Sequence, residues 1–108
     1  MAKYDVYAGL GGGFGGAEYK ETREFATPEE ADDYAYELAC QEYEMYEGMH
    51  GLPDMGDIEE DPEYFGLTED ASDEELEEAY VSAREGWIDY WAELVEEYSV
   101  YMRSLSEL

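Results

Sequence analysis

Carboxylates are by far the most frequent side chains in this sequence that are able to do chemistry. The chain holds 31 Asp and Glu residues but a single histidine, His50, and a single cysteine, Cys40. A cysteine nucleophile needs a histidine base and a third group that orients the histidine, and the sequence offers no identifiable third group. Carboxylate pairs suited to acid–base work occur throughout the chain, so none stands out. We therefore expect a binding protein and not an enzyme.

The glycine-rich stretch near the N-terminus matches a nucleotide-binding loop in spacing alone. Gly11-x-Gly13-x-x-Gly16 has the required glycines. Such a loop opens a helix and places the phosphates at the helix N-terminus, whereas residues 17–19 predict a strand. The sequence therefore predicts a turn here and no nucleotide cofactor.

A short acidic triplet begins like an EF-hand calcium loop. Asp57-x-Glu59-x-Asp61 has the first three ligand positions, but Pro62 stands where the loop needs glycine and Thr68 where it needs a bidentate glutamate. We expect no dedicated metal site, only the weak divalent-cation binding of any dense acidic cluster.

Rows of acids along the last predicted helix are more informative. Residues four apart on a helix lie about 6 Å apart along its axis, close to the spacing of successive phosphates along one nucleic-acid strand. An ordinary solvated helix face is the alternative, but such a face mixes Lys with Glu at this spacing, which stabilises the helix. Rows on this helix and acids in the preceding loop form the predicted partner-binding set: Asp57, Glu59, Glu60, Asp61, Glu74, Glu78, Glu85, Asp89, Glu93 and Glu97.

The net charge of −26 decides which partners are possible. Residues 1–27 hold four acids and three bases, while residues 28–108 hold the remaining 27 acids against Arg84 and Arg103. Nucleic acid and anionic membranes repel such a surface, so neither is an expected partner. Solubility or a salty habitat would also account for the acidity. The charge otherwise favours, as a partner, a basic protein that binds nucleic acid.

Residues 1–27 predict a two-stranded antiparallel hairpin. Lys3–Leu10 and Ala17–Ala26 both show strand-like alternation, and the glycines connect them. A hairpin alone is marginally stable in water, so it must pack on helices. The fold class is predicted to be α+β, with the N-terminal hairpin packed on two or three helices in a single domain over residues 1–108.

A helix is predicted over residues 28–49, followed by an acidic loop over residues 50–71. Thr27-Pro28-Glu29-Glu30 combines a capping threonine, a proline at the first helical position and the glutamate of a capping box. Gly48 is the predicted terminator.

Residues 72–106 predict a second, long or bent helix. It starts with the capping box of Ser72 and Glu75, and apolar residues then recur every three or four positions. An unbroken helix would be roughly 50 Å long against roughly 30 Å for the first. We therefore expect a bend near Gly86 or a break near Ser99. An overhang that packs on a second subunit, as in a homodimer, is the alternative.

The single cysteine and the absence of an apolar leader or of a long apolar stretch predict a cytoplasmic protein in a reducing compartment.

The twelve tyrosines predict an aromatic surface, because Tyr36, Tyr43, Tyr46 and Tyr64 do not all fit one buried stripe and some must be exposed. Exposed tyrosine among carboxylates is typical of interfaces. This pattern favours the alternative function, a non-catalytic adaptor or homodimeric interaction protein that uses a Tyr/Trp-rich surface.

Two segments, residues 14–19 and 42–51, resemble segments of phage proteins. The charge, size and mixed fold resemble DNA-mimic inhibitors, a class that includes anti-CRISPR and anti-restriction proteins; this likeness is one of composition over residues 28–108. It implies a phage-encoded inhibitor in the cytoplasm of an infected bacterium. Its carboxylates would stand in for phosphates and block the basic nucleic-acid-binding groove of a host defence nuclease.

Overall fold

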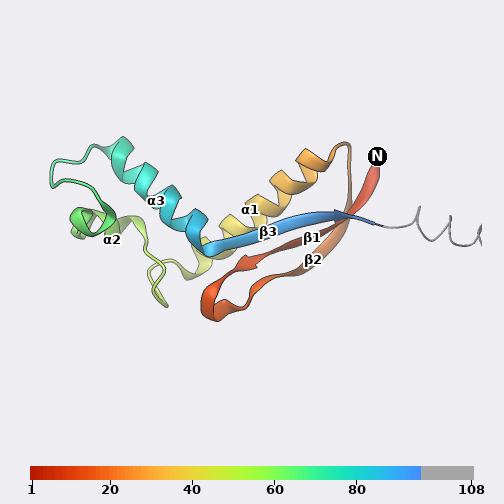
Figure 1. The fold of residues 1–108 in the computed structure, drawn as a ribbon, viewed down its shortest axis with the longest axis horizontal. Helices are drawn as coiled ribbons and strands as arrows, with labels where there is room; N and C mark the ends of the chain where they lie inside the picture. Colours follow the sequence, from red (N-terminus) through yellow and green to blue (C-terminus); the bar gives the residue numbers. More distant parts are fainter. Residues whose placement is uncertain (96–108) are drawn as a thin grey trace, which may run out of the picture.

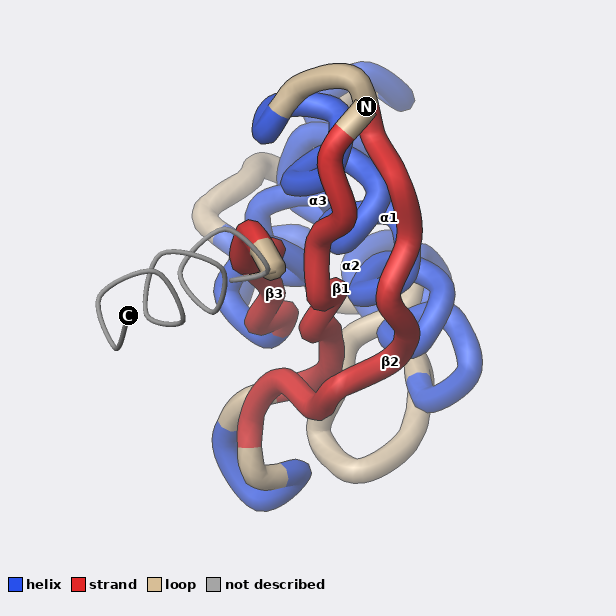
Figure 2. Tube along the Cα trace, turned by 90° about the vertical axis from the view of Figure 1, so that its right-hand side faces the viewer, coloured by secondary structure: helices blue, strands red, loops and turns tan. Residues whose placement is uncertain are grey.

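The computed structural model describes residues 1–95 of the 108-residue chain and has an α+β fold. An antiparallel sheet of order β2-β1-β3 forms its centre, so that β1 runs between the other two strands (Figure 2). Two helices extend from one end of this sheet and a third crosses it (Figure 1). The elements in chain order are β1 (Ala2–Leu10), the short 3-10 helix η1 (Gly12–Phe14), β2 (Gly16–Phe25), α1 (Pro28–Tyr46), α2 (Met55–Glu60), the 3-10 helix η2 (Pro62–Phe65), α3 (Asp73–Trp87) and β3 (Ile88–Leu94).

The core lies between β1 and α1. Every second residue of β1 is buried, because side chains alternate between the two faces of a strand. The opposing face of α1 carries small residues four apart, which let the helix approach the sheet closely. The buried residues of the two elements are Tyr4, Val6, Ala8 and Leu10 from β1, and Ala31, Ala35, Ala39 and Tyr43 from α1. The predicted N-terminal hairpin packed on a helix is therefore confirmed.

The start of α1 agrees with the sequence, and its end comes slightly early. The Thr27 hydroxyl accepts a hydrogen bond from the Glu30 backbone N–H at 3.1 Å, as a capping residue does. The helix ends at Tyr46, before the predicted boundary at residue 49. Gly48 then takes a left-handed conformation with φ of +80°, which favours glycine.

The segment predicted as a long loop, residues 50–71, contains α2 and η2. Two acids of this segment, Asp54 and Asp57, cap the start of α2. The Asp54 carboxylate accepts the Asp57 backbone N–H at 2.7 Å, and the Asp57 carboxylate accepts that of Asp54 at 3.0 Å. This reciprocal cap satisfies two donors at the helix start. Ile58 of α2 is fully buried.

The prediction of one long helix over residues 72–106 is wrong. Its start is confirmed, since Ser72 and Glu75 form the capping box. The helix ends at Trp87, next to the predicted bend at Gly86, and Ile88–Leu94 form β3, which pairs antiparallel with β1. Isoleucine, tyrosine and tryptophan suit a strand as well as a helix, and pairing with β1 decides for the strand. The rest of that predicted helix lies outside the described residues.

Candidate acidic binding surface

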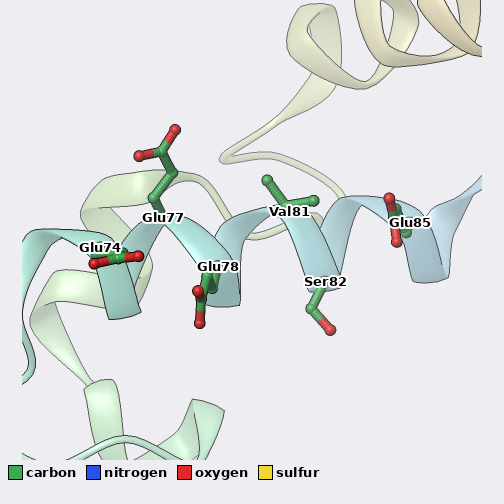
Figure 3. Close-up of a pocket in the computed structure, with 6 residues that line it drawn as sticks. All are labelled: Glu74, Glu77, Glu78, Val81, Ser82 and Glu85. Carbon is green, nitrogen blue, oxygen red and sulfur yellow. The ribbon is translucent and has the colours of Figure 1, made fainter.

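Six residues of α3 line a shallow groove of about 440 Å³ along the outer side of the helix. All six side chains come from this one helix, and four end in carboxylates (Figure 3). All four glutamates are exposed. The lining residues are Glu74, Glu77, Glu78, Val81, Ser82 and Glu85.

A second groove, of about 390 Å³, runs between α2 and α3. Glu59 of α2 and Asp73 of α3 line it, together with Glu77. Because Glu77 lines both grooves, the acids of the two helices form one connected surface. We call this the α3 acidic surface and define it by Glu59, Asp73, Glu74, Glu77, Glu78 and Glu85.

The one arginine near this surface points away from it. Arg84 is the single Lys or Arg among 14 acids between residues 51 and 87. Its guanidinium donates a hydrogen bond to the Tyr36 hydroxyl at 3.0 Å and lies 5.6 Å from the ring centre of Tyr80. Arg84 thus joins α3 to α1, and the outer carboxylates of α3 have no basic neighbour on their own helix.

Tyrosine hydroxyls donate hydrogen bonds to two acids, Glu47 at the end of α1 and Glu85 of the α3 acidic surface. Tyr80 donates to the Glu47 carboxylate, and burial together with this glutamate raises the pKa of Tyr80 above its ordinary value. Tyr36 also donates to Glu85 at 3.3 Å. These contacts hold α3 against α1 through side-chain hydrogen bonds.

The structure brings three predicted site residues of α3 together: Glu74, Glu78 and Glu85. The predicted row from Glu85 to Asp89 and Glu93 does not exist, because the last two lie on β3. In a strand, residues four apart lie on the same face but about 13 Å apart along the chain. On a helix the distance would be about 6 Å, so Asp89 and Glu93 do not continue the row of α3. Glu97, the last member of that row, lies outside the described residues.

Asp89 and Glu93 have other contacts. The Asp89 carboxylate accepts the Ala17 backbone N–H at 2.9 Å, which ties β3 to the start of β2. Glu93 accepts the indole N–H of Trp91 at 3.1 Å.

The four predicted loop acids separate as well. Asp57 forms the cap of α2, and Glu59 lines the groove against α3. Glu60 and Asp61 are exposed at the end of α2.

Sequence reasoning missed Asp73 and Glu77. Glu77 lies three residues after Glu74, so helical spacing alone placed it on the same side. The predicted row follows steps of four residues, and the step from Glu74 to Glu77 is three.

Within the part of the chain that the structure describes, no group of three or more His, Cys, Asp and Glu is arranged to hold a metal ion. Cys40 is half-buried on α1, and the ring of His50 packs near those of Phe14 and Tyr46. None of the described helices is long and apolar enough to cross a membrane. The glycine-rich stretch is followed by β2, as expected from the sequence.

No protein-family model matches this chain, and neither the curated proteins nor the solved structures contain a match to it.

Proposed function

We propose that this protein is an inhibitor that mimics nucleic acid and occupies the basic groove of a host defence nuclease of the restriction or CRISPR type. The α3 acidic surface carries the proposal. Six of the 15 residues of α3 are acidic. A helix of this length is about 22 Å long, which gives one carboxylate per ~3.7 Å. One strand of DNA carries one charge per about 3.4 Å, so the helix matches it in average charge density. Five of the six acids lie in the first six residues, and Glu85 lies about 10 Å further along the helix.

Local helix chemistry accounts for part of this charge only. Asp73, Glu74 and Glu75 lie in the first turn, where the helix dipole favours negative side chains. Glu77, Glu78 and Glu85 lie beyond it, and Arg84 is linked to Glu85 only through the Tyr36 hydroxyl. Glu74 lies three residues from Glu77 and four from Glu78, and like charges at these spacings destabilise a helix by a few tenths of a kcal/mol per pair. A basic partner would remove that cost on binding.

The kind of partner follows from the same features. A nucleic-acid-binding groove presents Lys and Arg at positions arranged for phosphates, and its binding to nucleic acid releases the cations condensed on the phosphates. A row of carboxylates on a rigid helix offers the same charges to these side chains. Complementary charge also accelerates the encounter of the two proteins.

The experiment is a pull-down from bacterial lysate at low salt, with elution by a salt gradient and identification by mass spectrometry. We expect recovery of a nucleic-acid enzyme that added DNA displaces. The test variant carries Glu77→Gln, Glu78→Gln and Glu85→Gln. The matched control carries Asp33→Asn, Glu37→Gln and Glu44→Gln, which remove equal charge from exposed positions of α1.

The α3 variant should lose the enzyme, and the α1 variant should retain it. Equal loss from both variants would show that net charge alone drives capture. An enzyme that DNA does not displace would contradict mimicry.

The second candidate function is a non-catalytic adaptor that uses aromatic side chains. The supporting observation is the exposure of large rings, with Tyr64 81% and Tyr19 56% exposed. Self-association that persists at high salt, measured by sedimentation, would favour this function over mimicry.

A further inference from the structure

The face of the sheet opposite α1 carries a row of three aromatic side chains. Tyr7 of β1 stands between Tyr19 of β2 and Trp91 of β3 in the register of the sheet. The Tyr7 and Trp91 rings stack with centroids 4.9 Å apart and planes 17° apart. The Tyr19 ring meets Tyr7 edge-on at 5.9 Å. Trp91 remains 38% exposed, so this row is open to a partner.

A bulge in the hairpin creates this row. Val6 pairs with Glu21 and Tyr7 with Tyr19, so Lys20 is passed over in the register. Lys20 instead forms an ion pair with Glu42 of α1 at 3.1 Å. The bulge therefore brings a tyrosine to the open face where a regular register would place a lysine.

Two carboxylates border the aromatic row. Asp5 and Glu93 face each other across β1 and β3, two residues along from Tyr7 and Trp91 and on the same face of the sheet. Like charges in directly opposite positions of a sheet are unfavourable. The pKa of Tyr7 is raised by partial desolvation and by the negative charges of Glu93 and Asp5. We call these five residues the aromatic face: Asp5, Tyr7, Tyr19, Trp91 and Glu93.

The protein already binds one of its own arginines with the same combination of groups. The guanidinium of Arg23 lies over the ring of Tyr34 at 4.8 Å from its centre. Glu21 accepts the Tyr34 hydroxyl and lies 3.7 Å from Arg23. An aromatic ring with an adjacent carboxylate is thus an arginine site on the α1 side of this sheet. The aromatic face offers two stacked rings and two carboxylates.

We propose that the aromatic face binds an arginine side chain of a basic protein partner, whose guanidinium stacks on the exposed ring of Trp91 and pairs with Glu93 and Asp5. Arginine fits better than lysine, because its planar group stacks on a ring and meets carboxylates at its edge simultaneously. A second copy of this chain fits poorly, because each copy carries a net charge of −26. The aromatic face shares no residue with the α3 acidic surface, so this proposal does not depend on that surface.

Nuclear magnetic resonance tests the proposal at the site itself. The two tryptophans, Trp87 and Trp91, each give one indole N–H signal, which Trp87→Phe assigns. The probes are three capped peptides of alternating glycine with arginine, lysine or the uncharged arginine analogue citrulline. We expect the arginine peptide to shift the Trp91 signal and leave that of Trp87 in place. The lysine peptide should bind about 3- to 10-fold more weakly, and the citrulline peptide should not bind.

Variants distinguish binding at the aromatic face from non-specific binding to the protein's negative charge. Glu93→Gln and Trp91→Leu should each weaken the arginine peptide several-fold, with folding checked by the Trp87 signal. The variant with Glu77→Gln, Glu78→Gln and Glu85→Gln should bind it as the wild type does. This last result separates a failure of the α3 proposal from a failure of the present one.

Three results would overturn the proposal. The first is equal binding of the arginine and lysine peptides. The second is a Trp91 signal that moves on dilution without peptide, which would identify a second copy as the occupant. The third is a Trp91 signal that moves on Arg103→Gln without peptide, which would identify the chain's own arginine.

Discussion

Tyrosine side chains in this protein serve both the interior and the surface. Tyr43 is fully buried and donates its hydroxyl to the Pro53 carbonyl at 2.5 Å. Tyr36 packs edge-on against Tyr90 and holds Arg84. Tyr64 is exposed, so the expectation that some of the tyrosines lie on the surface is confirmed. Which tyrosine is exposed depends on contacts between elements, and the sequence did not reveal it.

Burial of Tyr43 predicts a loss of stability in alkali. Burial, followed by the charge of Glu47, raises the pKa of Tyr43 to about 12 from 10.0. A raised folded-state pKa contributes stability that is complete below pH 10 and is lost as the pH rises toward 12. The free energy of unfolding should fall by about 2 kcal/mol across this window. Urea denaturation at a series of pH values measures it.

Two variants control this measurement. Tyr43→Phe should remove about 2 kcal/mol of the pH dependence and leave the part that Tyr80 contributes through its own raised pKa. It should also cost about 1 kcal/mol at neutral pH through its lost hydrogen bond. Tyr64→Phe, at the exposed position, should keep the wild-type profile. An unchanged profile in Tyr43→Phe would contradict the assignment to this residue.

At the scale of elements, starts of helices were predictable and the nature of the last element was not. The caps at Thr27 and Ser72 are contacts within four residues, so the local sequence specifies them. The pairing of β3 with β1 joins residues far apart in the chain. Apolar residues at steps of three or four across Trp87 fit a helix on both sides of the boundary, and only the vacant edge of β1 favours a strand.

The hairpin depends on close approach of its two strands at one glycine. A Cβ added at Gly9 would lie 2.6 Å from the carbonyl oxygen of Gly16. Gly9→Ala should therefore push the strands apart and cost about 1–3 kcal/mol of unfolding free energy. Gly13→Ala is the matched control, since an added Cβ there has no neighbour within 4 Å. Urea denaturation compares the two, and equal stability would contradict this packing.

At the scale of the whole molecule, the charge opposes the fold. A net charge of −26 on 108 residues creates self-repulsion that the compact state must bear. Among residues 1–95 the basic side chains of Lys20, Arg23 and Arg84 contact α1 or neighbouring aromatic rings. These three bases thus connect α1 to the sheet and to α3, and acids dominate the rest of the charged surface.

This repulsion predicts that salt stabilises the protein. Raising NaCl from about 20 mM to about 500 mM shortens the range of electrostatic repulsion. The melting temperature should rise by roughly 5 °C, the shift expected for about 1 kcal/mol in a domain of this size. Calorimetry or circular dichroism measures it.

The matched control is the variant with Asp33→Asn, Glu37→Gln and Glu44→Gln, which should show a smaller rise. A melting temperature that falls with salt would mean that attractive ion pairs outweigh the repulsion.

The sequence by itself determined the fold class, the hairpin, both long-helix starts and the acidic character of residues 28–108. These features follow from composition, alternation and contacts between near neighbours. Tertiary structure alone decided that Ile88–Leu94 form a strand, that Arg84 points inward, and that Tyr7, Tyr19 and Trp91 share one face. Each of these depends on pairing or packing between segments distant in the chain, where the local pattern is compatible with more than one structure.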